Sequence, residues 1–211
     1  MNSEAQDRKR VLVVDDDPIS LQIAALLLGS EGFAVEQAES GEEALRWLED
    51  HPQNEHPEVI LVDLQMPGIS GNALAARLRE AAGAHLIAMS ATEPAAGQVK
   101  EFDSFVLKPL DQAALLEIGQ GRLPPAAEPV STDHDDEAVL DLVVLAKLRK
   151  AMPPAAVAEV FAACLSDTRR RTAEMRKMSA AGDGAAVRAA AHTIKGGAAM
   201  VGAVRIATLA A

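Results

Sequence analysis

Val11-Leu12-Val13-Val14-Asp15-Asp16-Asp17 (residues 11–17) is a run of four apolar, mostly β-branched residues that ends in three carboxylates. A continuous apolar run of this length is typical of a strand that is buried on both faces, as strands are in parallel sheets. Ile60-Leu61-Val62-Asp63 repeats the pattern with a single carboxylate, and Leu107-Lys108-Pro109 closes another short run with a lysine. These stretches predict a buried parallel sheet whose strands end in charged side chains.

Strand and helix patterns alternate over the first 122 residues. Apolar residues recur at helical spacing from Ile19 to Leu27, and Ser40 with Glu43 forms a capping box at the start of a second helix. Further strands are predicted at 33–35, 59–62, 86–89 and 105–107, and further helices at 72–82 and 112–118. Strands that alternate with helices in this way predict an α/β fold with a doubly wound, five-stranded parallel sheet.

The pattern changes after residue 122. Residues 123–137 are rich in proline and acidic residues, so they cannot bury enough apolar surface to fold alone, and we interpret them as a linker. From residue 138 onward the pattern is purely helical, with an apolar stripe on Leu140, Val143, Val144 and Leu148. A long helix is expected from Pro153-Pro154, and a third follows a turn at 182–184. Helices joined by short turns predict an all-α bundle over residues 138–211.

Charge is unevenly distributed along the chain, whose net charge is −11. Residues 1–122 hold 21 acidic and 9 basic side chains, whereas residues 138–211 hold 5 acidic and 11 basic ones. The acidic part argues against nucleic acid as a partner, and the basic part, without interleaved aromatic residues, fits an acidic protein better.

Three features of the sequence bear on the cellular compartment of the protein. No apolar run approaches the roughly 20 residues that cross a bilayer, so we expect no membrane insertion. The charged opening segment does not resemble a signal peptide, and the lone Cys164 cannot form an internal disulfide. We therefore expect a cytoplasmic protein.

Polar residues follow four of the predicted strands. Asp15, Asp16 and Asp17 follow one, and Asp63, Ser90 and Lys108 follow three others. Because ligands of an open α/β sheet bind outside the carboxyl ends of its strands, we expect these side chains to converge. Clustered carboxylates repel one another unless a divalent cation lies between them, and oxygen ligands suit Mg²⁺. Asp63, alone at its strand end, is the natural nucleophile for an acyl phosphate.

Residues 10–120 resemble a response-regulator receiver domain. The resemblance rests on Val-Val-Asp-Asp-Asp-Pro, Val-Asp-Leu-Gln-Met-Pro-Gly, Met-Ser-Ala and Lys-Pro. It implies a flavodoxin-like receiver over residues 8–122, with strand order 2-1-3-4-5. It also implies the roles of individual residues: Mg²⁺ bound by Asp15, Asp16, Asp63 and the carbonyl of Gln65, phosphorylation of Asp63 by a sensor histidine kinase, phosphoryl oxygens held by Ser90 and Lys108, and Phe105 as the aromatic switch residue.

A second candidate site lies on the third helix of the C-terminal region. At about 100° per residue, Val187, Ala191, Ile194, Ala198 and Val201 share one side, which we interpret as the core stripe. His192 falls on another side, among Arg188, Lys195, Gly196 and small residues. An exposed imidazole between cations favours an incoming anion. Glycines within a helix cost roughly 1 kcal/mol each relative to alanine, so Gly196-Gly197 suggests close approach of another surface.

His192-Thr193-Ile194-Lys195-Gly196, with Gly202-Ala203 following, resembles the hallmark of a histidine phosphotransfer (HPt) domain. This resemblance implies a four-helix bundle over residues 138–211, phosphorylation of His192, and a docking surface shaped by Arg188, Lys195 and Gly196. Against that pattern the chain ends early, so we expect the bundle to lack its C-terminal helix. An incomplete bundle would leave apolar surface uncovered, through which the chain could self-associate.

The favoured function is that of a two-component phosphorelay protein, a phosphotransfer signalling protein rather than an enzyme, whose receiver catalyses at most its own phosphorylation and dephosphorylation. His192 would exchange phosphoryl groups with a receiver, either in its own chain, by intramolecular docking, or in another response regulator. Two alternatives stay open: a module that sequesters partners on phosphorylation while His192 is inert, and an aspartyl-phosphate phosphatase.

Overall fold

The protein, seen here as a computed structural model, divides into two compact units, residues 1–130 and 131–211. The structure describes residues 8–91, 93–108, 110, 114, 117–118 and 139–210. We call the unit of residues 1–130 the N-terminal unit and that of residues 131–211 the helical unit. The predicted linker, residues 123–137, lies outside the described residues, so the predicted domain boundaries remain predictions.

The N-terminal unit is built on five parallel strands in the order β2-β1-β3-β4-β5. They are β1 (Arg10–Val14), β2 (Ala34–Ala38), β3 (Val59–Asp63), β4 (His85–Ser90) and β5 (Ser104–Leu107). β1 and β3 are almost fully buried because they occupy the middle of the sheet. This order confirms the predicted doubly wound, flavodoxin-like sheet.

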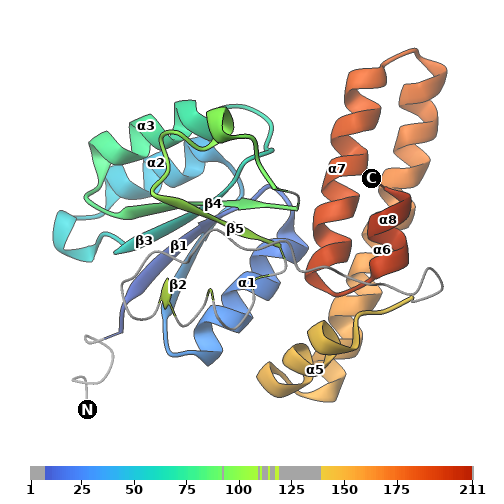
Figure 1. Ribbon diagram of the computed structural model, residues 1–211, viewed down its shortest axis with the longest axis horizontal. Coiled ribbons are helices and arrows are strands. Elements are labelled where there is room, and N and C mark those ends of the chain that lie inside the picture. The colour runs from blue at the N-terminus through green and yellow to red at the C-terminus, as the bar shows by residue number, and fades with distance from the viewer. Residues whose placement is uncertain are drawn as a thin grey trace. The chain divides into compact units, whose positions relative to one another are not determined.

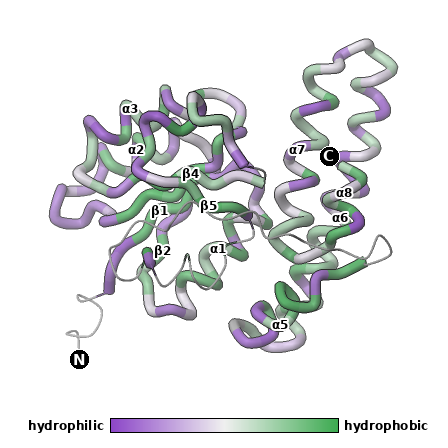
Figure 2. The backbone as a smooth tube through the Cα atoms, viewed as in Figure 1, coloured by the Kyte–Doolittle hydropathy of each residue, from purple (hydrophilic) through white to green (hydrophobic). Residues whose placement is uncertain are grey.

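Helices cover both faces of this sheet (Figure 1). They are α1 (Pro18–Ser30), α2 (Gly41–Asp50) and α3 (Gly71–Ala81), with short 3-10 helices η1 (Gln53–Glu55) and η2 (Ala96–Gln98). Figure 1 places α2 and α3 on one face and α1 on the other. Figure 2 shows the central strands as mostly hydrophobic, whereas α2 and α3 mix hydrophobic and hydrophilic residues, as helices with one solvent-facing side do.

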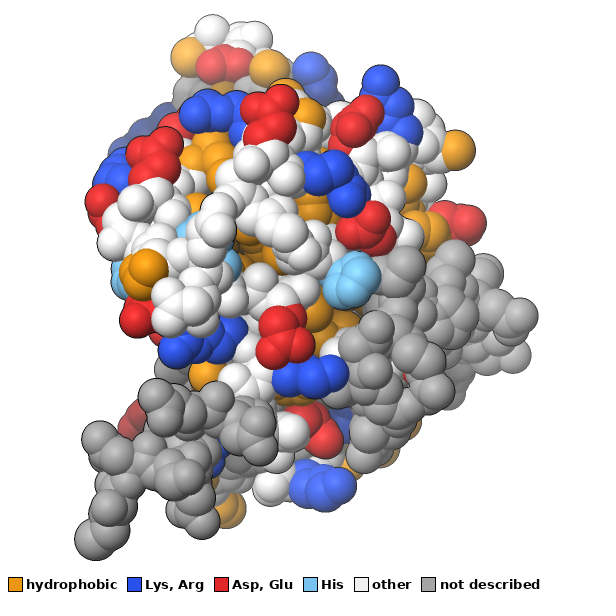
Figure 3. All heavy atoms as spheres, turned by 90° about the vertical axis from the view of Figure 1, so that its left-hand side faces the viewer, with side chains coloured by type: hydrophobic (Ala, Val, Ile, Leu, Met, Phe, Trp, Pro, Cys, Tyr) orange, Lys and Arg blue, Asp and Glu red, His pale blue; other side chains and the backbone are white. Residues whose placement is uncertain are grey.

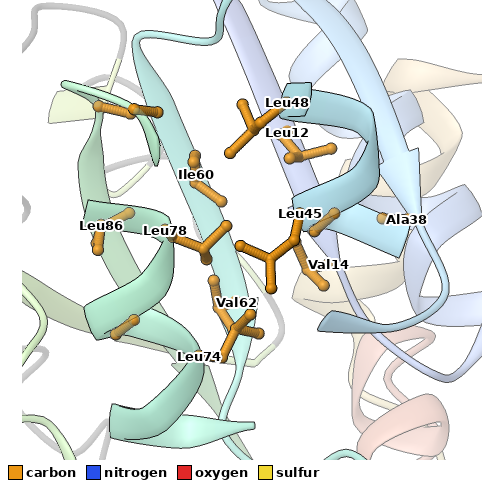
Figure 4. Packing of buried hydrophobic residues seen from close by; sticks show 14 of the residues in the cluster. Leu12, Val14, Ala38, Leu45, Leu48, Ile60, Val62, Leu74, Leu78 and Leu86 are labelled. Carbon is orange, nitrogen blue, oxygen red and sulfur yellow. The ribbon is translucent and has the colours of Figure 1, made fainter. Parts of the chain in front are cut away.

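The core beneath α2 and α3 is made by alternate residues of the central strands. Figure 4 shows Leu12 and Val14 of β1 beside Ile60 and Val62 of β3, packed against leucines of both helices. Because successive side chains of a strand point to opposite faces, the intervening residues, such as Val13 and Leu61, face the side of α1. Burial of every β1 residue but the first is the physical origin of the continuous apolar run in the sequence.

The crossover between β4 and β5, for which the sequence predicts no helix, differs from the other three. Each of the three other crossovers contains an α-helix, but residues 91 and 93–103 hold only the three-residue turn η2. Pro94 and Gly97 lie in this segment, and both residue types disfavour a helix interior. The helix expected at 112–118 falls largely outside the described residues, of which 114, 117 and 118 are helical.

The helical unit contains α5 (Leu142–Ala151), α6 (Pro154–Ala180), α7 (Gly184–Met200) and α8 (Val204–Leu209). The long helices α6 and α7 form a hairpin around Gly182, whose φ of +76° suits glycine. Cys164 is buried, as expected of a small core residue. The predicted stripe on α5 is correct for Val144 and Leu148 and wrong for Leu140 and Val143, which are exposed. Leu140 precedes the helix because Asp141 is its N-cap.

The surface of the N-terminal unit is mixed in charge. Figure 3 shows lysine and arginine side chains interspersed with acidic ones over the end of the molecule turned to the viewer. Across the described parts of the chain, every helix is too short or too polar to cross a membrane.

The first testable consequence of this packing concerns Gly41, the first residue of α2. A Cβ atom there would lie 2.4 Å from the carbonyl oxygen of Ile69, and backbone cannot move aside cheaply. We expect Gly41→Ala to lower the free energy of unfolding of the N-terminal unit by about 1–3 kcal/mol. Urea titration followed by fluorescence of Trp47, the only tryptophan of the sequence, reports on this unit.

The matched control is Gly29→Ala in α1, where a Cβ would meet no atom within 4 Å. This change should raise the free energy of unfolding by about 0.5–1 kcal/mol, because alanine loses less conformational entropy in a helix. Equal effects of the two substitutions would contradict the packing of α2 described here.

Candidate functional site

The polar residues singled out in the sequence lie at the carboxyl edge of the sheet. Asp15 and Asp16 follow β1, Asp63 ends β3, Ser90 ends β4 and Lys108 follows β5. These four strands are neighbours in the parallel sheet, so their carboxyl ends meet at the same edge (Figure 1). The predicted convergence is therefore explained by strand order rather than by proximity in sequence.

Lys108 joins two of the carboxylates. Its Nζ atom lies 2.5 Å from Oδ2 of Asp15 and 3.0 Å from Oδ2 of Asp63. All three side chains are buried, with exposed fractions of 3%, 1% and 6%. A buried lysine is tolerated only when it is paired and hydrogen-bonded, and Lys108 is both. The backbone N–H of Lys108 also donates to the carbonyl of Ser90, which ties β5 to β4 next to the site.

Electrostatics at this cluster disfavour ionisation of Asp15. Burial raises the pKa of Asp15, and the charge of Asp63 adds to it, so that the pKa lies above its usual range despite the opposing charge of Lys108. For Lys108, burial acts to lower the pKa, but the charges and hydrogen bonds of Asp15 and Asp63 outweigh it and raise the pKa. The lysine is therefore a permanent cation, and it leaves an excess of negative charge beside it.

That excess fits a divalent cation. Among the described residues, Asp15, Asp16 and Asp63 each offer a ligand atom, and these atoms lie within 4.8 Å of one another. All are carboxylate oxygens, the ligand type that Mg²⁺ prefers. The donor set and the raised pKa of Asp15 both fit an ion of this kind.

The three consecutive aspartates have different surroundings. Asp15 is buried beside Lys108, and Asp16 is half-buried. Asp17 is the N-cap of α1, where its Oδ2 accepts hydrogen bonds from the backbone N–H and the hydroxyl of Ser20 at 3.1 and 2.9 Å. Its backbone N–H donates to Oδ1 of Asp15. Capping α1 thus fixes the backbone that carries the other two.

His192 lies on α7 of the helical unit and is half-buried. Of its expected neighbours on that helix, Arg188 is exposed, Lys195 is half-buried and Gly196 is buried. The core stripe is confirmed for Ile194, Ala198 and Val201, which are buried, whereas Val187 and Ala191 are only half-buried. The docking role of Arg188, Lys195 and Gly196 stays a prediction.

The comparison with protein families decides the identity of the N-terminal unit. The model of the response regulator receiver domain matches residues 11–120, just over half of the 211 residues. The chain belongs to the receiver domain family. The Hpt domain model matches residues 159–211, so a receiver domain is followed by an Hpt domain, as both sequence resemblances predicted. This pair of domains supports a two-component phosphorelay protein.

Curated relatives resemble the receiver. The chain is 29% identical over 120 residues to the DNA-binding response regulator MtrA of Mycolicibacterium smegmatis, covering 55% of this chain and 51% of that protein. It is 43% identical over 75 residues to a gliding motility regulatory protein of Myxococcus xanthus, covering 36% of this chain and 9% of that protein. The chain thus spans about half the length of these relatives or less.

Among solved structures, the response regulator TrrA of Thermotoga maritima, in complex with Mg²⁺ and BeF, is 30% identical. The match covers 53% of this chain and 96% of the TrrA chain, with a TM-score of 0.47.

Three predicted site residues of the receiver have placements that leave their roles untested. Ser90 is buried at the end of β4. The backbone N–H of Gln65 donates to Oδ1 of Asp63 at 3.3 Å, so Gln65 lies next to the carboxylate. Phe105 is half-buried and packs against the core beneath α2 and α3.

Sequence reasoning missed Glu42, which holds the loop after Asp63 in place. Oε1 of Glu42 accepts a hydrogen bond from the backbone N–H of Ile69 at 3.1 Å, and this bond lowers the pKa of Glu42. A Cβ atom on Gly68 would lie only 2.9 Å from the same Oε1 atom of Glu42. A glutamate in the first turn of a helix has an ordinary explanation in the helix dipole, so the sequence carried no signal for this contact.

The raised pKa of Asp15 predicts how the receiver responds to pH without metal. An acid with a raised pKa stabilises the fold below its ordinary pKa of 3.8, and this stability is lost as the pH rises through the raised value. Asp15→Asn should therefore raise Tm at pH 7.5 in EDTA and have little effect at pH 3.5. A gain of about 1 kcal/mol would move Tm by about 4 °C.

Calorimetry of the full chain measures this effect, with Glu36→Gln on the exposed part of β2 as the control that removes a carboxylate elsewhere. Mg²⁺ should raise Tm of the wild type at pH 7.5 and that of Asp15→Asn much less. A lower Tm for Asp15→Asn in EDTA at pH 7.5 would show that the attraction of Lys108 outweighs burial and repulsion.

Proposed function

We propose that this chain is a two-site phosphorelay protein. Asp63 of the receiver accepts a phosphoryl group from a sensor histidine kinase with Mg²⁺ as cofactor, and His192 of the Hpt domain exchanges a phosphoryl group with a receiver. The proposal is supported chiefly by the buried cluster in which Lys108 bridges Asp15 and Asp63 at the carboxyl edge of the sheet. The match of residues 159–211 to the Hpt domain supports a second site in the helical unit.

Asp63 is suited to be the acceptor by its surroundings. Its carboxylate contacts Lys108, which stays protonated and places a positive charge beside the attacking oxygen. An oxygen of Asp63 attacks the phosphorus of a phosphohistidine, an O–P bond forms, the N–P bond breaks, and the leaving imidazole takes up a proton. The added phosphoryl oxygens then offer Lys108 a stronger partner than the carboxylate alone, and the hydroxyl of Ser90 can donate to another of them.

Mg²⁺ would be held by carboxylate oxygens of Asp15, Asp16 and Asp63 and by the carbonyl of Gln65. When bound, it neutralises charge on the phosphoryl oxygens during transfer. The residues themselves account for part of this task. Lys108 offsets one carboxylate charge, while Asp16 and a second carboxylate of the cluster offer further ligand oxygens.

His192 is suited to accept from an acyl phosphate. Its ring nitrogen attacks the phosphorus, the bond to the aspartate oxygen breaks, and the carboxylate regains its negative charge while the imidazole gives up a proton. Arg188 and Lys195 lie four residues before and three residues after it on the same helix, and so on neighbouring turns. Their positive charges favour both the phosphoryl group and the acidic surface of a receiver.

The receiver served by His192 is either that of the same chain or that of another response regulator. Complementary charge favours docking in both arrangements, because residues 1–122 are strongly acidic and residues 138–211 are basic. Steering of this kind weakens with ionic strength, so transfer should slow as salt is added.

The acceptor role of Asp63 is tested by Asp63→Asn. We expect this change to abolish incorporation of phosphate from acetyl phosphate and Mg²⁺ into the receiver, because an amide has nearly the same shape as the carboxylate but is far less nucleophilic. Intact-mass spectrometry of the full chain measures incorporation, and Glu36→Gln serves as the control. Retained base-labile phosphate on the Asp63→Asn receiver would place the acceptor elsewhere, with Asp16 the next candidate.

The role of His192 is tested by mixing two variants. His192→Gln, phosphorylated on Asp63, is the donor, and Asp63→Asn is the acceptor that retains His192. We expect acid-labile, base-stable phosphate to appear on the acceptor, and the double variant Asp63→Asn/His192→Gln to stay unlabelled.

Label on His192 of the wild-type chain alone, without transfer between variants, would indicate intramolecular exchange. Unlabelled His192 in every arrangement would contradict exchange with this receiver. It would favour the alternative in which the phosphorylated receiver only binds and sequesters partners.

A further inference from the structure

The crossover from β4 to β5 is held by side chains of α3 rather than by a helix of its own. The three other crossovers contain helices of 13, 10 and 11 residues, whereas the described residues 91 and 93–103 contain only η2. Backbone groups outside a helix need other hydrogen-bond partners. In this crossover, α3 supplies several of them.

Asn72 is the first of these partners. Its Nδ2 atom donates to the carbonyl of Gly97 at 2.7 Å, and its Oδ1 atom accepts from the backbone N–H of Glu101 at 3.3 Å. One amide side chain thus bridges two points of the crossover, at η2 and beyond it. Both the donor and the acceptor of the amide are used, which is how an asparagine fixes a backbone conformation.

Arg79 is the second partner, two turns along α3 from Asn72 and so on the same side of the helix. Its Nη2 atom donates to the carbonyl of Glu101 at 3.0 Å and to Oδ1 of Asp103 at 2.9 Å. Oδ2 of Asp103 accepts from the backbone N–H of Leu86 in β4 at 2.8 Å. This chain of contacts closes the end of the crossover against the sheet.

Both ends of the crossover lead directly into the phosphoryl-binding edge. Ser90 is the last residue of β4 and immediately precedes the crossover, and β5 leads from its other end to Lys108. The hydrogen bond from the backbone N–H of Lys108 to the carbonyl of Ser90 joins the residue before the crossover to the residue after β5. Movement of the crossover would therefore be passed first to Ser90, the strand residue next to it.

We propose that Asn72 is a positioning residue for phosphoryl transfer to Asp63. By clamping the crossover at Gly97 and Glu101, Asn72 holds the Ser90 hydroxyl where it meets a phosphoryl oxygen. This proposal rests on the proposed function, because it assigns to Ser90 a contact with the phosphoryl group. It adds a residue outside the acidic cluster that acts through Ser90 and not through the metal.

A double-mutant cycle tests this assignment. The rate of Asp63 phosphorylation by acetyl phosphate at saturating Mg²⁺ is measured for the full-length wild type, Asn72→Ala, Ser90→Ala and the double variant. We expect Asn72→Ala to slow phosphorylation about tenfold in the wild-type background, the effect of losing two hydrogen bonds. In the Ser90→Ala background the same change should have less than about a twofold effect, because its target is gone.

Mg²⁺ affinity, measured by isothermal titration calorimetry, should be unchanged by Asn72→Ala, whereas a general loosening of the fold would weaken it. Glu80→Ala, at an exposed position of α3, is the matched control and should leave the rate unchanged. Asn72→Asp keeps the acceptor for Glu101 but sets a carboxylate oxygen against the carbonyl of Gly97, so it should slow phosphorylation at least as much, with the same dependence on Ser90. It also replaces Asn72→Ala in the cycle if that variant fails to fold.

Equal slowing by Asn72→Ala in both backgrounds, or no slowing in either, would overturn the proposal while leaving Asp63 as the acceptor. A wild type that takes up no phosphate on Asp63 would instead refute the proposed function, and the positioning role with it.

Discussion

A buried lysine between two carboxylates is the constraint on which the receiver depends. Lys108 can be buried only because Asp15 and Asp63 lie within 2.5 and 3.0 Å of its Nζ atom, and these residues come from positions 45 to 93 residues apart. Only a sheet that places β1 and β3 side by side, with β5 beyond β4, brings them together. The parallel order is thus a requirement of the charge cluster as well as of the apolar core.

The cluster is arranged for function at some expense of stability. Replacing a buried ion pair by apolar residues is often neutral or stabilising, so such a pair is weak evidence of a structural role. Here the balance is uneven as well, because one lysine faces several carboxylates and the pKa of Asp15 is raised by burial. A site that is short of positive charge is prepared for ligands that bring it, and strongly perturbed groups in one place are typical of functional sites.

The sequence alone predicted the features that leave a local pattern, namely buried strands and the polar residues that follow them. β1 and β3 could be found because strands covered on both faces need apolar residues at every position, and Asp63 because it interrupts such a run. No helix was predicted between the strands at 86–89 and 105–107, and the described residues of this crossover hold only η2. Leu140 was misassigned because Asp141, the true N-cap of α5, was not recognised as the start of the helix.

Glu42, Asn72 and Arg79 could not have been found, because they are exposed or half-buried polar residues on helices, where the sequence permits almost any polar residue. Their partners lie 22 to 29 residues away and are mostly backbone groups, which leave no mark in the sequence. Motifs identify the groups that perform chemistry, since these need particular atoms at strand ends. The groups that hold those ends in place need only be long and polar enough to contact a backbone group of a neighbouring segment. Such contacts can be identified only once the fold is known.

The two proposed phosphoryl acceptors differ in their surroundings. Asp63 is buried beside Lys108, so a phosphoryl group there would be held by fixed charges and shielded from water. His192 is half-buried on α7, with the cations Arg188 and Lys195 on neighbouring turns of the same helix. Exchange therefore requires α7 to dock at the carboxyl edge of a receiver's sheet. On the functions proposed above, the residues that border that edge, including the crossover bound by Asn72, would influence both the stability of the acyl phosphate and access to it.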